Sequence, residues 1–194
     1  GWDEQSLAAL EALKDAPEQF FPTDPTETTA SIGGMTACNA SGARSYLYGP
    51  MRRHVTALRG VLADGRVFSL RRGQCFADGL RFRLPLADGS FVEGSLPDYH
   101  MPQCKNASGY FIAPGMDLLD LLIGSDGTLA VVTAVELALM PLPNVIWGAT
   151  CFFPSEQSAA QFTEKVRADM KNIAALEYFD ARAMDILREQ RAAG

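Results

Sequence analysis

A run of small residues over 24–49 constrains this chain more than any other feature. Thr, Ser, Ala and Gly dominate the run, so it buries little apolar area for its length. Ser31-Ile32-Gly33-Gly34 opens a short predicted helix there, and paired glycines let backbone N–H groups approach a phosphate or a flat polar ring that a Cβ would block. A tight turn packed against a sheet requires the same glycines, so spacing alone leaves both interpretations open.

Charge and composition exclude two broad classes of protein. The 194 residues include 17 Lys and Arg against 23 Asp and Glu, giving a net charge of −6, and 47% are hydrophobic. This composition is that of a globular chain with about one domain, not of a disordered one. Nucleic acid is not expected as a partner, because the only dense basic pairs are Arg52-Arg53 and Arg71-Arg72.

Cysteine spacing and hydropathy bear on the compartment. No apolar run approaches the roughly 20 residues that span a bilayer, so we expect no transmembrane segment. The cysteines are widely separated with no C-x-x-C pair, so neither a metal site nor a dense disulfide framework is predicted. We expect reduced thiols in a cytoplasmic protein. The four positions are Cys38, Cys75, Cys104 and Cys151.

Apolar spacing and turn residues predict the elements before residue 141. A helix is expected over 6–14, and two hairpins are expected around the turns Asp64-Gly65 and Asp88-Gly89. Asp117 is the predicted N-cap of a helix over 118–123. The stretch 128–140 is predicted to be one long strand, central in a sheet because both of its faces are largely apolar.

Pro141 and Pro143 mark the clearest boundary in the chain. Beyond them, strands are predicted over 145–153 and 175–179, alternating with helices capped by Ser155 and Asp180. This β-α-β-α segment is too short to close a sheet. We therefore expect one domain over 1–143 and the incomplete start of a second over 144–194.

A second glycine-bearing segment, GSDGTLAVVT at 124–133, leads directly into the predicted long strand. Its small residues would let a ligand lie across the start of the strand. A simple helix-to-strand connection with glycine at the helix C-cap also explains the segment, and is preferred if the segment is considered alone.

Together, the two segments resemble the FAD-linked oxidases of the vanillyl-alcohol-oxidase superfamily, which have a PCMH-type FAD-binding fold. The branch most similar contains glycolate oxidase, D-lactate dehydrogenase and D-2-hydroxyglutarate dehydrogenase. The resemblance covers most of the chain in order, which is more specific than one glycine pattern. It runs through SIGGMTACNASGARSYLYGPMRRHV, VLADGRV, KNASGYF and DLLDLLIGSDGTLAVVTAVELALMPLP, and more weakly through LEYFDARAMDIL.

The resemblance implies an α+β fold: the second FAD-binding subdomain, a mixed or antiparallel sheet with flanking helices, followed by the first β-α-β-α part of an α+β cap domain. It also implies FAD as cofactor. Two positions depart from the family, which usually has Glu at Asp126 and Gly at Ala130. The residues implied to contact FAD are Thr29, Ala30, Ser31, Gly33, Gly34, Cys38, Asn39, Ala40, Ser41, Asp126, Gly127, Thr128, Ala130, Val131 and Val132.

The implied activity is oxidation of a 2-hydroxy acid, such as glycolate or D-lactate, by hydride transfer to the flavin. The family's Pro-Gly-Gly-rich first subdomain and its late cap segments are not found here, so we expect a middle section of a longer enzyme. Such a piece would be inactive and would bind FAD weakly or not at all without the missing N- and C-terminal parts. Alternatives are a non-catalytic FAD-binding or assembly subunit of a multi-chain oxidase, and a scaffold that binds no flavin. A redox-partner subunit or a homo-oligomer stays open.

The remaining candidates have simpler interpretations, and no catalytic residue is assigned. His54 is interpreted as structural and His100 as a surface loop residue. Cys38 is expected to be a small buried thiol within the cofactor wall. Four acidic residues are interpreted as turn and helix-start residues rather than as an acid–base pair. They are Asp24, Glu27, Asp117 and Asp120.

Overall fold

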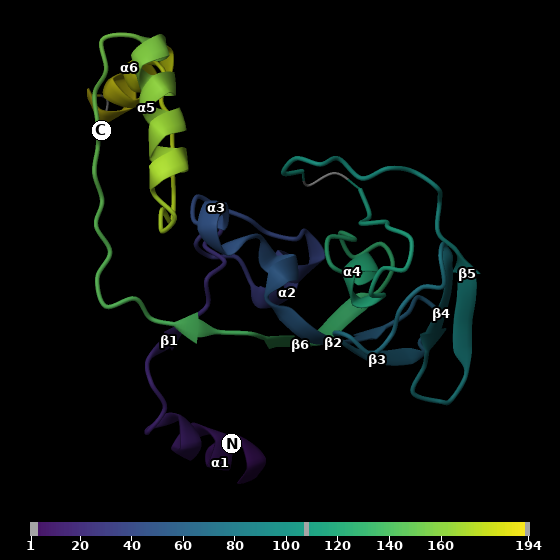
Figure 1. The fold of residues 1–194 in the computed structure, drawn as a ribbon. Helices are drawn as coiled ribbons and strands as arrows, with labels where there is room; N and C mark the ends of the chain where they lie inside the picture. The colour runs from purple at the N-terminus through teal and green to yellow at the C-terminus, as the bar shows by residue number, and fades with distance from the viewer. Residues whose placement is uncertain (1–3, 107–108, 193–194) are drawn as a thin grey trace.

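The computed structural model describes residues 4–106 and 109–192. It is an α+β fold of short antiparallel sheets with flanking helices, as the sequence predicts (Figure 1). The helices are α1 (Glu4–Leu13), α2 (Ile32–Ala37), α3 (Ser45–Tyr48), α4 (Leu119–Leu122), α5 (Glu156–Asp169) and α6 (Ala181–Ala192), with a 3-10 turn at Met51–Arg53. The strands are β1 (Gln19–Phe20), β2 (Val55–Val61), β3 (Val67–Arg71), β4 (Arg81–Pro85), β5 (Phe91–Ser95), β6 (Val131–Leu137) and β7 (Met140–Pro141).

Both predicted hairpins are confirmed. β2 pairs antiparallel with β3 from Ala57↔Arg71 to Val61↔Val67, and β4 pairs with β5 in the same way. In the first turn, the Asp64 carboxylate accepts a 3.0 Å hydrogen bond from the Arg66 backbone N–H, and Gly65 takes a φ of 86°. Asp-Gly closes this hairpin because glycine adopts a positive φ without a Cβ clash.

The predicted central strand is wrong in position. The three-stranded sheet has the order β3-β2-β6, so β2 is central and β6 lies at the edge. The register between β2 and β6 shifts so that Thr133 is an extra residue between Val132 and Ala134. Such a bulge reverses the alternation of side chains, which is why Val131 is exposed while Val132 and Val135 pack against the core. The apolar pattern of the sequence does not reveal the extra residue, so it predicted one continuous apolar face.

The core fills the space between the three-stranded sheet and the helices above it, where Figure 1 shows α2 and α4 on one face. Phe68 of β3 and Leu58 of β2 are fully buried there. A Cβ built at Gly60 would lie 2.4 Å from the Phe68 ring, so glycine at this position makes room for the aromatic side chain. From α4, Leu119 and the neighbouring Ile123 complete the packing.

The elements after residue 141 are only partly as predicted. Ser155 caps α5, its hydroxyl accepting from the Ser158 N–H, and Asp180 caps α6 by accepting from the Ala183 N–H. The predicted strands over 145–153 and 175–179 are wrong, because neither segment pairs with another strand. Figure 1 shows the first of them running away from the sheets as an extended stretch. An alternating apolar sequence forms a ladder only where a second strand supplies the hydrogen bonds.

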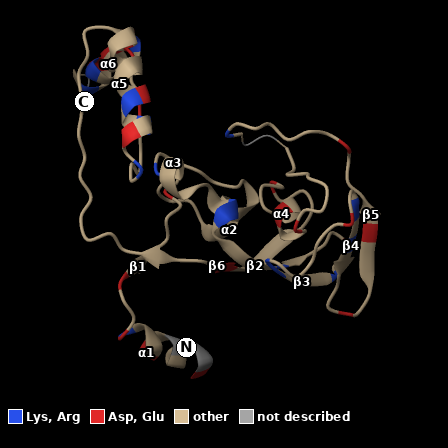
Figure 2. Cartoon of the chain, viewed as in Figure 1, with Lys and Arg blue, Asp and Glu red and all other residues tan. Residues whose placement is uncertain are grey.

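The helices in the described part of the chain are neither long nor apolar enough for any of them to cross a membrane. α5 carries both acidic and basic residues along its length (Figure 2). In α1 the predicted helix is confirmed, but Leu7, Leu10 and Leu13 are all exposed, so its apolar stripe is not covered.

Candidate functional site

The helix α2 begins as the glycine motif predicts. Ser31 has an extended backbone and its hydroxyl accepts a 3.1 Å hydrogen bond from the Gly34 N–H, so it is the N-cap. A Cβ at Gly34 would lie 3.2 Å from that hydroxyl, whereas a Cβ at Gly33 would meet nothing within 4 Å. Gly34 is therefore explained in part by the cap, and Gly33 leaves backbone open at the surface.

The end of α2 meets the second glycine-bearing segment directly. The Gly124 N–H donates to the Thr36 carbonyl at 3.0 Å, and the Asp126 N–H donates to the Ala37 carbonyl at 2.8 Å. Gly124 takes a φ of 83° and Asp126 a φ of 52°. These positive values turn the chain so that the N–H groups of Gly124 and Asp126 both face α2. The two segments that the sequence singled out are thus joined at one place.

Arg52 connects this junction to the rest of the fold. Its backbone N–H donates a 2.9 Å hydrogen bond to the side-chain carbonyl of Asn39, which follows α2 and has a φ of 49°. Its guanidinium donates to the backbone carbonyls of Asp120, within α4, and of Ile123, just after that helix. The same group lies over the Phe111 ring, 4.7 Å from the centroid. Arg52 therefore contacts three separate segments, one through its backbone N–H and two through its side chain.

The Asp120 carboxylate holds two arginines. Arg72 donates to its two oxygens at 2.9 and 3.2 Å, and Arg52 approaches one of them at 3.5 Å. Burial lowers the pKa of the Arg52 guanidinium, and the Asp120 carboxylate opposes that shift. Two cations share one anion, so the cluster keeps a net positive charge.

A cavity of about 560 Å³, here called the α2 cavity, opens beside this junction. This volume lies within the roughly 300–1,000 Å³ usual for small-molecule sites. Small residues, including Ser41, Gly42, Ala43 and Gly124, form part of its lining. Tyr46 and Phe111 add aromatic rings, Arg52 and Lys105 add positive charge, and Glu177 adds one carboxylate. The lining suits a planar, anionic ligand.

The predicted cofactor residues divide between this cavity and its surroundings. Cys38, Asn39 and Ser41 line the cavity. Ala40 packs against the core next to them. Thr29, Ala30, Ser31, Gly33 and Gly34 lie before or in the first half of α2, away from the cavity lining.

The second predicted group occupies the turn before β6 and the start of that strand. Asp126, Gly127 and Thr128 are exposed, and the Thr128 hydroxyl lies 2.6 Å from the Tyr110 hydroxyl. Ala130 is buried, so its methyl group faces the core. Val131 and Val132 lie on opposite sides of β6, the first exposed and the second partly buried. Only the Asp126 end of this group is hydrogen-bonded to α2.

The expectation for Cys38 is wrong. Its thiol is exposed and lines the α2 cavity, while its S–H donates to the Gly34 carbonyl at 3.1 Å. The residue stands just after the last turn of α2, where the helix ends and its side chain leaves the core. Sequence reasoning also missed Arg52 and Phe111. Both residues lie in segments that carry the family resemblance, MRRHV and KNASGYF, but neither segment assigns them a role.

His54 has the geometry of a structural residue, as expected. It is 5% exposed, its Nε2 lies 2.9 Å from the Tyr48 carbonyl oxygen, and its ring meets Phe21 edge-on. Burial lowers the pKa of its imidazole, the Tyr48 carbonyl opposes that shift, and Arg53 adds to it. The acidic residues also have local partners: Glu27 accepts from the Thr29 N–H and Asp117 from the Leu119 N–H.

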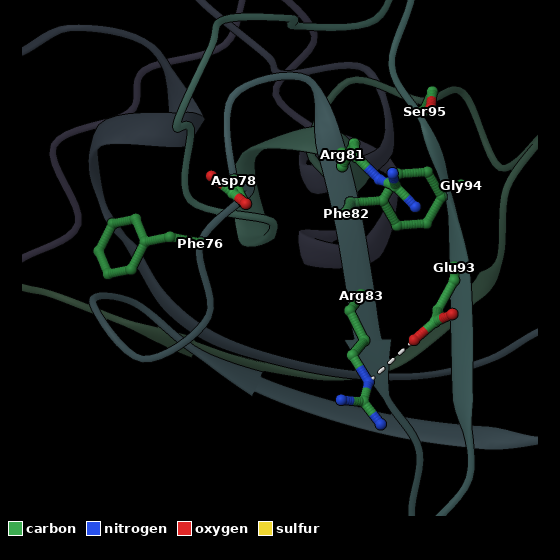
Figure 3. Close-up of a pocket in the computed structure, with 8 residues that line it drawn as sticks. All are labelled: Phe76, Asp78, Arg81, Phe82, Arg83, Glu93, Gly94 and Ser95. Atoms are coloured by element: carbon green, nitrogen blue, oxygen red, sulfur yellow. Dashed lines mark ion pairs between the residues drawn. The ribbon is translucent and has the colours of Figure 1, made fainter.

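A second cavity, of about 370 Å³, lies on the β4–β5 hairpin (Figure 3). Arg83 and Glu93 point toward one another in it and form a 3.0 Å ion pair. The Phe82 ring covers Gly94, where a Cβ would lie 2.8 Å from the ring. None of the predicted cofactor residues lines this hairpin cavity. No group of three or more His, Cys, Asp or Glu within 4–106 and 109–192 is placed to hold a metal ion.

Comparison with known proteins gives the family. A family model described as an FAD binding domain matches residues 6–71. The D-lactate dehydrogenase of Archaeoglobus fulgidus is 34% identical over 180 residues, covering 91% of this chain and 32% of that protein. The chain belongs to the FAD-linked oxidase family. The match includes α2 and Arg52, so the first of the two joined segments lies within the FAD-binding domain.

Further relatives of this FAD-linked oxidase family carry related names. The mitochondrial D-2-hydroxyglutarate dehydrogenase of Bos taurus is 32% identical, covering 95% of this chain and 28% of that protein. The glycolate oxidase subunit GlcD of Bacillus subtilis is 27% identical, covering 90% of this chain and 30% of that protein. The chain spans between 18% and 32% of the length of these and the other curated relatives it matches.

The cofactor of the family is FAD, and the residues at the α2 cavity fit it. FAD carries a planar ring system and a negatively charged pyrophosphate. The aromatic rings of Tyr46 and Phe111 offer apolar faces, and Arg52 and Lys105 offer the opposite charge. Gly42 and Gly124 line the same cavity and add no side chain to it.

Proposed function

We propose that this chain supplies part of the FAD site of an oxidoreductase that oxidises a 2-hydroxy acid. The observation that carries the proposal is the hydrogen-bonded junction of α2 with the 124–126 turn beside the α2 cavity. The names of the relatives, D-lactate dehydrogenase, D-2-hydroxyglutarate dehydrogenase and glycolate oxidase subunit, support the substrate class. FAD, when bound, supplies the hydride acceptor for such an oxidation.

The residues of this chain are assigned to binding and orientation. Cys38, Asn39 and Ser41 would present backbone and small side chains to the cofactor, and the junction would keep them in place. Arg52 and Lys105 would favour the negatively charged groups of FAD or of the substrate. The remaining predicted contacts are proposed to extend this surface along α2 and the start of β6. They are Thr29, Ala30, Ser31, Gly33, Gly34, Ala40, Asp126, Gly127, Thr128, Ala130, Val131 and Val132.

We also propose that residues 1–143 belong to the FAD-binding domain and that 144–194 begin the domain covering the substrate. The change of character after β7 supports this division, because the chain leaves the sheets there as an extended stretch. In a complete enzyme, further parts of the same protein would close the site. Its partners would be a small 2-hydroxy acid and either a redox-partner subunit or a second copy.

A non-catalytic role is the second candidate. The GlcD relative is named as a subunit of glycolate oxidase, so an FAD-binding subunit of a multi-chain oxidase is a related possibility. The compartment proposed is the cytoplasm, supported by four free cysteines among the described residues. Relatives named as mitochondrial, such as that of Bos taurus, make cell fractionation the test of this point.

Flavin spectroscopy on the complete protein tests the proposal. The protein should be yellow, with flavin absorption at about 450 nm, and D-lactate, glycolate or D-2-hydroxyglutarate should bleach that band under anaerobic conditions. A colourless protein that does not take up added FAD contradicts both candidates. A yellow protein whose flavin no 2-hydroxy acid reduces contradicts the enzyme and favours the subunit.

A further inference from the structure

The Arg52 guanidinium is bound mainly to other groups of the protein rather than left free to bind a ligand. The Arg52 side chain is only 17% exposed, although the residue lines the α2 cavity. The hydrogen bonds of that group go to backbone carbonyls of α4 and to the Asp120 side chain. The planar, forked donor geometry of arginine is what allows one group to serve several acceptors at once.

The position of Arg52 is coupled to both segments that form the junction. Its backbone N–H fixes the Asn39 side chain after α2. Its guanidinium nitrogen would lie 3.2 Å from a Cβ at Gly124, so the side chain packs against the turn that donates to α2. The aromatic face of Phe111 lies on the guanidinium and brings a third segment of the cavity wall into the same cluster.

The charge of Arg52 is also fixed within the fold. The Asp120 carboxylate forms ion pairs with both Arg52 and Arg72. The Arg72 guanidinium also donates a 3.0 Å hydrogen bond to the Arg52 backbone carbonyl. A guanidinium held by this many partners is restricted in its freedom to reorient toward a ligand. Its contribution to ligand binding must then come largely from positioning the groups that it contacts, the Gly124 turn and Phe111.

Resting on the proposed function, we propose that Arg52 is the positioning residue of the α2 cavity. Its backbone N–H holds Asn39, and its side chain keeps the Gly124 turn and Phe111 in a single arrangement with it. The side chain sets FAD affinity through that arrangement rather than through its charge alone. A lysine at this position would keep the charge but lose the forked contacts with α4 and the planar contact with Phe111.

Amide hydrogen exchange tests the arrangement without any flavin. In the 194-residue chain, Arg52→Lys and Arg52→Met should each lower protection at the Gly124 and Asp126 amides by about tenfold or more, because local opening becomes easier. Protection within β2 should stay unchanged. The control is Arg71→Lys, the same chemical change at an arginine that pairs with Glu136 at the surface, and it should leave the Gly124 and Asp126 amides unaltered.

FAD titration followed by amide chemical shifts provides the second readout. Arg52→Lys should weaken binding at the α2 cavity by about tenfold, because a misplaced wall loses near-ideal contact geometry. Phe111→Leu removes only the planar contact, and should lower protection at Gly124 by a smaller factor. This variant keeps the test decisive if the arginine variants do not fold.

Three results would overturn the inference. If Arg52→Lys keeps the parent's amide protection at Gly124 and Asp126 and its FAD affinity, a positive charge alone is enough at this position. Loss of protection across β2 together with the junction would show a general structural role. Unchanged protection at Gly124 in Phe111→Leu, with unfolded arginine variants, would also contradict it. A parent chain that binds FAD without a shift at any amide of the cavity would instead contradict the proposed function, while the exchange experiment would still decide the role of Arg52.

Discussion

Gly42 packs directly against the backbone of Asp24: a Cβ built on this glycine would lie 1.5 Å from the Asp24 carbonyl oxygen. Gly42 also lines the α2 cavity, so the same residue connects the cavity to the segment that precedes α2. The glycine is required here by a contact between two backbones, whether or not a ligand is bound.

Gly42→Ala should therefore lower the free energy of unfolding by about 1–3 kcal/mol, the usual cost of forcing extra atoms into a packed position. Urea denaturation of the 194-residue chain measures it. Gly148→Ala is the control, since its Cβ would meet nothing within 4 Å, and it should change stability by no more than about 0.5 kcal/mol. Equal stability of the two variants would show that the 24–42 contact is absent in solution.

The glycine motif illustrates how far sequence reasoning reaches. Sequence patterns correctly predicted the start of α2, the hairpin turns and the helix caps at Ser155 and Asp180, because these features depend on residues close together in the chain. For the paired glycines Gly33 and Gly34, spacing alone left close approach of a ligand and a tight turn against a sheet both open. The contact of Gly42 with Asp24 gives a reason that only the folded chain reveals.

Errors arose where an element depends on distant partners. The alternation over 128–140 predicted one continuous face, but the extra residue Thr133 changes the phase and places Val131 in solvent. Strands over 145–153 and 175–179 required partners that no local pattern identifies. Arg52 was overlooked for the same reason, since its partners Asp120 and Ile123 are distant in sequence.

Burial of His54 predicts a dependence of stability on pH. Its pKa is below the ordinary 6.5 in the folded chain, so the unfolded chain binds more protons as the pH falls through that value. The contribution of neutral His54 to stability is thus complete above pH 6.5 and is progressively lost below it. His54→Gln should reduce the fall in stability between about pH 7.5 and pH 5, measured by urea denaturation at each pH. An unchanged slope in His54→Gln would contradict this account.

Removing the charge from Asp120 should leave two arginines without their shared partner. Asp120→Asn is expected to lower the free energy of unfolding by about 2 kcal/mol, typical of hydrogen bonds to charged groups. The control is Glu93→Gln, which breaks an exposed ion pair with Arg83 and should cost only about 0.5 kcal/mol. Denaturation curves for both variants decide the point, and an effect of Asp120→Asn no larger than that of the control would show the cluster to be energetically unimportant.

Thiol reactivity checks the correction at Cys38. Cys38, Cys104 and Cys151 are exposed and should react readily with a thiol reagent in the native chain. Cys75 should react more slowly, because burial and the Asp117 carboxylate raise the pKa of its thiol. Mass spectrometry of the labelled chain identifies each site. Slow labelling of Cys38, comparable to Cys75, would restore the original expectation of a buried thiol.

The most direct test of the proposed site is to add FAD to the isotope-labelled chain and follow backbone amide shifts by NMR. We predict saturable shifts at Cys38, Asn39, Gly42, Gly124 and Asp126, even if binding by this chain alone is weak. The β4–β5 residues around the hairpin cavity should not respond. Shifts confined to the hairpin, or saturable FAD binding that shifts none of the five amides, would contradict the account.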